Sequence, residues 1–373
     1  MKRFEFLKAM VVAAVLCTLT HRVAAATAEK PNILWIYAED TSPWMGCYGD
    51  KINAGATPNI DSIASAGVLF TRAFVPAPVC SATRSAMMIG QNSIRFGAHE
   101  HRSSRKVPIH LPSGVKMLPQ VMQDKGYTTF NAGKSDYNFV SSGEAYNFTM
   151  KGRTSFKALV DRQPFFGQIQ TAGGKNNTKK FPQDRKVKPA DVTVPADYPD
   201  NDIYRAVVAQ HYDAIRKDDD LIGKILDGLK AAGLDENTIV VYLSDHGANN
   251  LTRHKQMTTE GGLHVPFAVM GPEKFVPKQQ LRKDLVSMLD LSATTLVWAG
   301  IDIPEWYEGR NLFARNFKAR RYVGSQKDRL DHTIDRVRTI RTDMFRYVRN
   351  FKLDRIFLQP QYRDNRDFLV NLH

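Results

Sequence analysis

Two apolar runs constrain the fold of this chain more than any other feature. Residues 32–37 read NILWIY and residues 238–243 read TIVVYL, without a regular alternation of apolar and polar side chains. Such runs are typical of strands that are buried on both faces of a parallel sheet. Around them, segments with helical spacing alternate with further strand-like segments. The pattern predicts an α/β fold with a large, mostly parallel central sheet flanked by helices.

Turn-forming residues mark where the predicted helices begin and end. Thr57 and Pro58 suit the N-cap and first position of a short helix that stops at Gly67, before a strand at residues 68–70. The other predicted helices are residues 118–125, about 203–232 and 285–299, and the other predicted strands are residues 127–131, 164–169 and 265–270. Residues 151–200 are rich in Lys, Pro and Asn, which indicates mostly long surface loops near the entrance of a site.

Both apolar runs end in residues that can bind a metal. Glu39 and Asp40 follow the first run, and Asp245 and His246 follow the second. Ligands of open α/β sheets bind beyond the carboxyl ends of the strands, so these four side chains are expected to converge. Three carboxylates and an imidazole suit a hard divalent cation, Ca²⁺ in the first place and Mg²⁺ in the second.

A cysteine opens a short helix-like stretch, Cys80 to Ile89. The start of a helix favours an anion, because its N–H groups are unpaired and its dipole is positive there, and Arg84 adds a cation one turn on. This arrangement suits a nucleophile that faces an oxyanion. Two other interpretations stay open: Cys80 packs as a small buried residue, or it forms a disulfide with Cys47.

The N-terminus and the charge indicate where the protein works and what it meets. Residues 1–26 combine basic residues, an apolar segment and small residues, which predicts a signal peptide too short to span a membrane. We expect an exported protein, periplasmic or secreted in a bacterium, with no stable membrane anchor. The net charge is +14, and four basic residues against one acidic in residues 1–26 leave about +11 on the rest. This charge favours polyanionic partners, although a generally basic surface is the alternative, and no motif indicates nucleic acid.

An ordered set of motifs between residue 31 and about residue 315 resembles the type I sulfatase family. The motifs are Pro31 to Leu34 with Glu39 and Asp40, Gly46 to Gly49, Thr57 to Asp61, Cys80 to Arg84, Gly133 with Lys134, Ser244 to Gly247, and Lys255 with Glu260 to Gly262. The flanking segments 94–99 and 136–138 are similar to the bacterial heparan N-sulfatase-like branch. The resemblance implies an alkaline-phosphatase-like fold and hydrolysis of sulfate esters or N-sulfates of sulfated poly- or oligosaccharides.

The resemblance also implies a chemistry for Cys80. A separate formylglycine-generating enzyme would oxidise it to an aldehyde, whose hydrate carries the attacking hydroxyl. Arg84 would hold this group and a metal-ligand carboxylate, while Lys134 and Lys255 would neutralise the charge of the sulfate. Ala82 stands where proline is commoner, but Arg84 is retained, so we expect maturation to occur.

Several positions depart from the family pattern. Asp136 stands where the family usually has a histidine, and no histidine follows the strand near residue 166. The residues expected to contact the substrate are therefore His99, His101, Asp136, Lys175 and His264. Among them, His99, His101 and His264 are, together with Lys255, the candidates for the group that protonates the leaving oxygen.

Three regions are expected along the chain. Residues 1–26 form the signal peptide, residues 27–315 the catalytic domain, and residues 316–373 the incomplete start of a smaller C-terminal subdomain. Two alternatives to a sulfatase are kept. One is a phosphate or phosphonate hydrolase of the same superfamily, against which Cys80 argues because Ser or Thr is more usual there. The other is an inactive, polyanion-binding homologue, suggested by the missing histidines.

Overall fold

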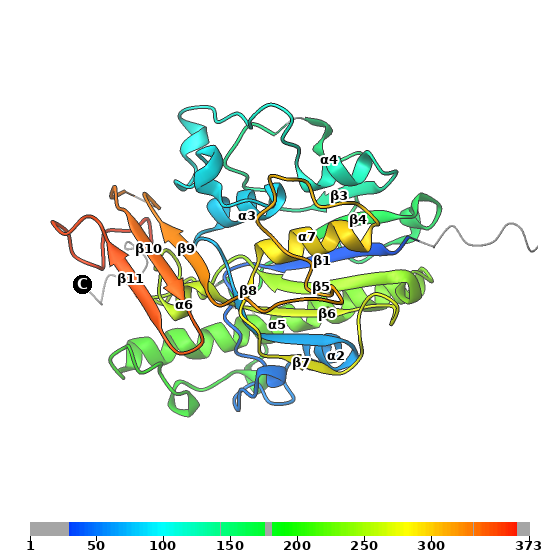
Figure 1. Cartoon of the computed structure of the whole chain (residues 1–373). Coiled ribbons are helices and arrows are strands. Elements are labelled where there is room, and N and C mark those ends of the chain that lie inside the picture. Colours follow the sequence, from blue (N-terminus) through cyan, green and yellow to red (C-terminus); the bar gives the residue numbers. More distant parts are fainter. Residues whose placement is uncertain (1–29, 142, 176–180, 331, 364–373) are drawn as a thin grey trace, which may run out of the picture. The chain divides into compact units, whose positions relative to one another are not determined.

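A computed structural model of the chain describes residues 30–141, 143–175, 181–330 and 332–363 (Figure 1). The predicted signal peptide, residues 1–26, lies outside these residues. Within them, the strands form one eight-stranded sheet and one three-stranded sheet. Among the helices of these segments, none is long and apolar enough to cross a membrane.

The two apolar runs lie side by side in the centre of the large sheet. They form β1 (Asn32–Ala38) and β5 (Thr238–Ser244), which are parallel and fully buried, and β4 (Phe165–Thr171) pairs in parallel with the other edge of β1. The remaining strands of this sheet are β2 (Val68–Phe74), β3 (Thr128–Ala132), β6 (His264–Met270), β7 (Gln280–Arg282) and β8 (Val286–Ser287). The order is β3-β4-β1-β5-β6-β2-β7, with β8 paired to β2 and β6 antiparallel to both its neighbours. The predicted mostly parallel α/β fold is confirmed.

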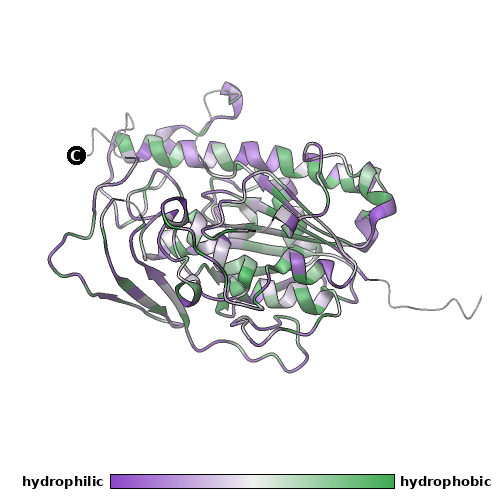
Figure 2. Ribbon diagram, turned by 90° about the horizontal axis from the view of Figure 1, so that it is seen from above, coloured by the Kyte–Doolittle hydropathy of each residue, from purple (hydrophilic) through white to green (hydrophobic). Residues whose placement is uncertain are grey.

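Helices cover both faces of this sheet. Those helices are α2 (Pro58–Ala66), α3 (Cys80–Ile89), α4 (Leu118–Gln123), α5 (Asp202–Ala231), α6 (Glu260–Leu263) and α7 (Leu289–Trp298). Successive side chains of β1 point to opposite faces. Accordingly, Trp35 packs in the core under α3, α4 and α7, whereas Ile36 packs in the core under α2 and α5. Figure 1 shows the two groups of helices on opposite sides of the sheet, and Figure 2 shows apolar and polar residues alternating along α5.

The register of β1 and β5 determines where the site forms. Tyr37 is opposite Leu243, and Ala38 is opposite Ser244. The next residues of each strand therefore leave the sheet at the same level. This pairing brings the Glu39–Asp40 and Asp245–His246 segments together, although about 200 residues separate them in the chain.

Some predicted boundaries were wrong. The helix expected from residue 285 begins at Leu289, because residues 286–287 pair with β2 as the short strand β8. Thr57 precedes α2 as expected but makes no capping hydrogen bond; its hydroxyl accepts from the N–H of Gly46 instead. Residues 151–200 are not only surface loops, because four apolar side chains from residue 187 to 198 are buried against α5.

The small sheet lies in the region expected to begin the C-terminal subdomain. It consists of the antiparallel strands β9 (Val323–Lys327), β10 (Val337–Arg341) and β11 (Arg346–Asn350). The N–H of Gln326 donates to the carbonyl of Pro76, and the hydroxyl of Ser325 donates to the carbonyl of Val75. These contacts attach β9 to the segment that leads into α3.

Candidate active site

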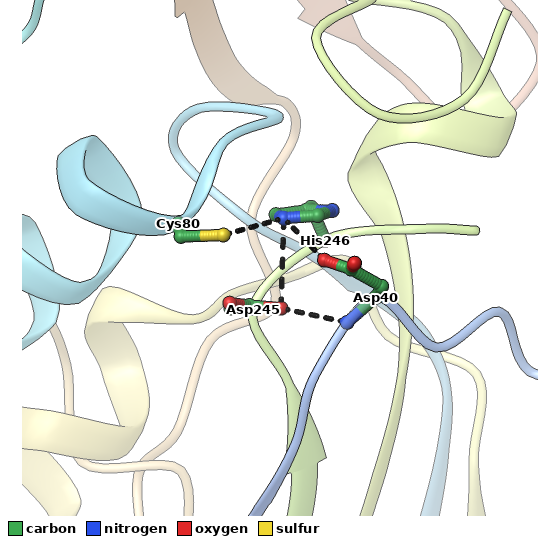
Figure 3. Close-up of side chains that lie close together, drawn as sticks. All are labelled: Asp40, Cys80, Asp245 and His246. Carbon is green, nitrogen blue, oxygen red and sulfur yellow. Dashed lines mark hydrogen bonds and ion pairs between the residues drawn. The ribbon is translucent and has the colours of Figure 1, made fainter. Parts of the chain in front are cut away.

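Four side chains from three segments converge at the carboxyl end of the central sheet (Figure 3). They are Asp40, Cys80, Asp245 and His246, whose potential ligand atoms all lie within 4.8 Å of one another. The N–H of Asp40 donates to Asp245 Oδ1 at 3.0 Å, which links the ends of β1 and β5. His246 Nε2 lies 3.0 Å from Asp40 Oδ1 and 3.2 Å from Cys80 Sγ. All four residues are buried.

Cys80 is the first residue of α3, as the sequence predicts. The helix is closed by Gly90, which adopts the left-handed conformation (φ 72°) and donates its N–H to the carbonyl of Ala86. Burial alone would raise the pKa of the Cys80 thiol, but Lys255, His246 and Lys134 together lower it below its ordinary value. Cationic neighbours thus favour an anion at this position.

The disulfide interpretation of Cys80 is wrong, because Cys47 and Cys80 are both free. The N–H of Cys47 donates to Asp61 at 2.8 Å, and its side chain packs against the core under α2. Burial and the Asp61 carboxylate raise the pKa of Cys47. Cys47 is therefore an unreactive packing residue, whereas Cys80 sits among cations.

Arg84 lies one turn after Cys80 and fixes the acidic residue at the end of β5. Its Nε and Nη2 atoms lie 3.1 and 3.0 Å from Asp245 Oδ2, and Nη1 donates to Gln170. The guanidinium also stacks over Tyr37, 4.3 Å from the ring centroid. Gln170 and Tyr37 were not among the predicted site residues. Both lie on buried strands, and their positions next to Arg84 depend on strand order.

Lys255 pairs with the acidic residue at the end of β1. Its Nζ lies 3.0 and 3.3 Å from the two carboxylate oxygens of Asp40, and both side chains are buried. Burial would raise the pKa of Asp40, but Lys255 and His246 hold it well below its usual range. Asp40 is therefore ionised at neutral pH.

The donor set fits a divalent cation. Asp40 and Asp245 supply carboxylate oxygens, and the carbonyl of Gly247 accepts from His246 Nδ1 at 2.9 Å. Because a carbonyl can only accept, the Nδ1 atom carries hydrogen, which directs the other ring nitrogen, Nε2, toward the two carboxylates. Burial lowers the pKa of His246, yet Asp245, Cys80 and Asp40 raise it to about 10. A proton and a metal ion therefore compete for the same nitrogen atom.

The predicted metal ligand Glu39 lies outside this group of four. Its carboxylate is shared by Lys134 at 3.2 Å and Lys175 at 3.0 Å, with Arg84 at 3.7 Å. In this arrangement the Glu39 carboxylate is paired with three cations, and its role as a metal ligand stays a prediction. Glu39 thus contacts both the buried Arg84 and the more exposed Lys134 and Lys175. Lys175, a predicted substrate-binding residue, therefore lies near the site.

Asp136 forms the centre of a second charged cluster. Arg102 forms a bidentate ion pair with it, at 2.9 Å for both contacts, and Arg105 and Lys134 lie at 3.3 and 3.5 Å. Arg102 and Asp136 both have a left-handed backbone, with φ of 54° and 50°. Such strain in non-glycine residues is common at functional sites. Arg102 and Arg105 were not among the predicted site residues, although they lie one and four residues after the predicted His101.

The three predicted substrate-binding histidines lie in different surroundings. His101 Nδ1 is 2.8 Å from the hydroxyl of Ser81, the residue after Cys80. His99 Nε2 is 3.9 Å from Asp328, which follows β9. His264 begins β6, where its Nε2 is 2.8 Å from the carbonyl of Thr71 and its ring packs against Phe74. The structure therefore brings His101 to the site and gives His264 contacts within the protein.

Comparison with known proteins extends these observations. The family model described as Sulfatase matches residues 31–188 and 161–301. An ulvan-active sulfatase of Formosa agariphila is 26% identical over 90% of this chain and 63% of its own length. The N-sulphoglucosamine sulphohydrolase of Homo sapiens is 27% identical over 78% of this chain and 65% of its own length. The chain thus spans less than two thirds of the length of either relative.

A solved structure supports the same fold. The structure of a 2-O GAG sulfatase matches with a TM-score of 0.66 and 21% identity, covering 87% of this chain and 83% of that one. The family model, whose two matched segments together cover residues 31–301, shows that the chain belongs to the sulfatase family.

Proposed function

We propose that this chain is an exported sulfatase that hydrolyses sulfate esters or N-sulfates of sulfated polysaccharides or oligosaccharides. The observation that carries the proposal is the position of Cys80, at the start of α3 and 3.2 Å from a histidine of the buried group Asp40, Asp245 and His246. A nucleophile at a helix start, beside a cation site and two buried cationic side chains, suits transfer of an anionic group.

Asp40, Asp245 and His246 would hold one divalent cation, Ca²⁺ or, second, Mg²⁺. Carboxylate oxygens are the ligands that these ions prefer. Such a cation supplies positive charge that stabilises the sulfate oxygens as the bond to sulfur breaks. The side chains around it are then responsible for holding the nucleophile and the remaining sulfate charge.

Cys80 would be matured to formylglycine by a separate formylglycine-generating enzyme. The retained Arg84 and the free state of Cys80 support this proposal. Ala82, which replaces the commoner proline, is fully buried with Ala77, Val79 and Leu330. A small apolar residue therefore satisfies the packing of the folded protein at this position.

Three cations of this site would act directly on the sulfate or the nucleophile. Arg84 holds Asp245 and keeps its guanidinium close to the start of α3. Lys255 and Lys134 are both among the charged groups that lower the pKa of Cys80, so both lie near its sulfur atom. In a buried site, fixed charges of this kind stabilise a transition state more strongly than they would in water.

The more exposed cations indicate a polyanionic substrate. The side chains of Arg102, Lys175 and Arg105 are 35%, 45% and 65% exposed. Together with Lys134 they make four cations around two carboxylates, Glu39 and Asp136. A glycan with further sulfate or carboxylate groups would satisfy this excess charge.

The test compares ester classes on protein that has been co-expressed with a formylglycine-generating enzyme and loaded with Ca²⁺. We expect release of sulfate from aryl sulfates and sulfated glycans, and loss of this release in Cys80→Ala. Faster hydrolysis of phosphate or phosphonate esters would identify the alternative hydrolase. Absence of turnover with every ester class, in protein shown to contain the aldehyde and the metal, would identify the inactive homologue.

A further inference from the structure

We propose that His101 is a catalytic residue that donates a hydrogen bond from Nε2 to the leaving oxygen of the substrate, and that Ser81 is its positioning residue. The inference rests on the proposed sulfatase function. It assigns a specific role and a specific protonated nitrogen atom to one of the histidines near the site.

Ser81 and His101 are held in place from several sides. Ser81 follows Cys80 in the first turn of α3 and is fully buried, and His101 is 8% exposed. The N–H of His101 donates to the carbonyl of Arg329 at 2.9 Å. The amide of Asn138 donates to the carbonyl of Glu100, the residue before it. The backbone around His101 is therefore fixed independently of its ring.

The hydrogen bonds of Ser81 determine which ring nitrogen carries the proton. Its hydroxyl oxygen accepts from the N–H of Arg102 at 3.1 Å and lies 2.8 Å from His101 Nδ1. The hydroxyl hydrogen needs an acceptor, because an unpaired buried polar group costs about 1–3 kcal/mol. Nδ1 is the acceptor within reach in the described residues. Ser81 therefore donates to Nδ1, and the ring proton is on Nε2.

The His101 ring shares its surroundings with Cys80. The charged groups that face the ring are Arg102, Asp136, Lys255 and Lys134, and the last two also face the Cys80 thiol. Burial, with Arg102 and the two lysines, lowers the pKa of His101 to about 3. The ring is thus neutral at neutral pH. Its Nε2–H is a hydrogen-bond donor, as neutral imidazoles are in some other active sites.

The other titratable side chains near the site have partners within the protein. Burial raises the pKa of Asp136, but Arg102 and Lys134 lower it, so this carboxylate only accepts. Lys255 is paired with Asp40, and Lys134 with Glu39. His264 is bonded to the carbonyl of Thr71. His101 is bonded through Nδ1 to Ser81, the residue after Cys80, and its Nε2 has no hydrogen-bond partner in the described residues.

The step is balanced with His101 neutral before and after. The bond between sulfur and the leaving oxygen breaks, and its electron pair stays on that oxygen. A bond forms between sulfur and the oxygen of the attacking hydroxyl, and the proton that this hydroxyl loses ends on the departing oxygen, so that a neutral alcohol leaves. His101 forms no bond to the substrate; its Nε2–H stabilises the negative charge that develops on the oxygen during the step.

The test uses a series of aryl sulfates whose phenols differ in pKa. Charge on the leaving oxygen is largest for the least acidic phenols, so a donor to that oxygen matters most for them. We expect His101→Ala, which removes the donor, to lower kcat/KM about 10-fold for 4-nitrophenyl sulfate and about 10²–10³-fold for phenyl sulfate. Ser81→Ala should lower kcat/KM less, but again most for the least acidic phenols. Ser81→Thr retains the hydroxyl and should restore the kcat/KM of wild type.

The kcat/KM values of different aryl sulfates are compared within each variant. Partial unfolding lowers all of these values by the same factor, so it does not change their ratio. The exposed His110, as His110→Ala, is the matched control and should leave the trend of wild type unchanged. Equal losses for all phenols in His101→Ala would overturn the inference while leaving the sulfatase function in place. A wild-type protein that releases no sulfate from any member of the series would overturn the proposed function, and the inference with it.

Discussion

Two groups of charged side chains lie at the carboxyl end of the central sheet, and they differ in their contact with water. The inner group is Asp40, Arg84, Asp245, His246 and Lys255, whose side chains are 0% to 4% exposed. The outer group is Glu39, Arg102, Arg105, Lys134, Asp136 and Lys175, whose basic members are 23% to 65% exposed. Cys80 belongs with the inner group.

This difference in solvent exposure separates the charges expected to act in the chemical step from those expected to attract the substrate. A buried charge costs several kcal/mol of desolvation unless it is paired, and each inner charge has a partner within 3.3 Å. Removing one partner should therefore affect both folding and chemistry. The outer cations are screened by water and salt, so each contributes about 1 kcal/mol or less.

The largest effect is expected at the inner group, in Asp245→Asn. The change removes the charge that pairs with Arg84 and His246, and leaves the buried guanidinium with only the longer, 3.7 Å ion pair to Glu39. We expect binding of Ca²⁺ to be lost, sulfate release to fall at least about 10³-fold, and unfolding to require about 3–5 kcal/mol less. Calorimetric titration with Ca²⁺ and denaturant unfolding measure these changes.

The matched control for this substitution is Asp124→Asn. Asp124 pairs with Lys116 at the surface, where both side chains are half exposed. It should change neither Ca²⁺ binding nor stability by more than about 1 kcal/mol. If Asp245→Asn behaved like this control, the inner group would not be a metal site.

An intermediate effect is expected at the outer group, in Lys175→Ala and Arg105→Ala. Each removes one partly exposed cation, so KM for a sulfated glycan should rise about two- to fivefold at low salt. The rise should shrink at 0.3 M salt, because the Debye length falls well below 10 Å. Kinetics at two salt concentrations test this, with Lys116→Ala as the control for loss of a surface lysine. A rise in KM that is independent of salt would contradict the assignment.

The smallest effect is expected far from both groups, in Glu260→Gln. Glu260 joins α6 to β10 and β11 through ion pairs of 3.1 and 2.8 Å to Arg341 and Arg346. Burial raises its pKa, but Arg346 and Arg341 lower it below the ordinary value. Its stabilising effect is therefore present at neutral pH and is lost as the pH falls through the lowered folded-state pKa.

Because Glu260 is about half exposed, the loss at pH 7 should be about 1 kcal/mol or less. Thermal unfolding of both proteins between pH 3 and pH 7 measures it, and the two curves should converge at the acidic end. A difference that grew as the pH fell would refute the proposed sign.

The residues of the inner group could be predicted from the sequence, whereas Arg102 and Arg105 of the outer group could not. Asp40, Asp245 and His246 follow buried strands, and parallel pairing brings such strand ends together whatever the intervening loops do. Cys80 and Arg84 are one helical turn apart, so their proximity is local. The proximity of these five residues could be predicted from the parallel type of the strands and the spacing of residues along a helix.

The outer group depends on backbone conformation that composition does not reveal. Arg102 and Asp136 form an ion pair and both have a left-handed backbone. No glycine or turn motif in the sequence predicts this backbone conformation. Glu39 was predicted to bind metal because it follows the end of β1, and the pairing of its carboxylate with Lys134 and Lys175 could not be predicted. The Ser81–His101 contact likewise requires the chain to return to α3 after 20 residues.

The central claim is that Cys80 is matured to formylglycine and acts as the nucleophile beside the inner group. Peptide mass spectrometry across residues 80–84 tests it most directly, on protein from a host that has a formylglycine-generating enzyme. The account predicts the mass of an aldehyde in place of the CH₂SH group of Cys80, together with release of sulfate that Cys80→Ala abolishes. An unmodified Cys80 thiol in protein that still hydrolyses sulfate esters would contradict it.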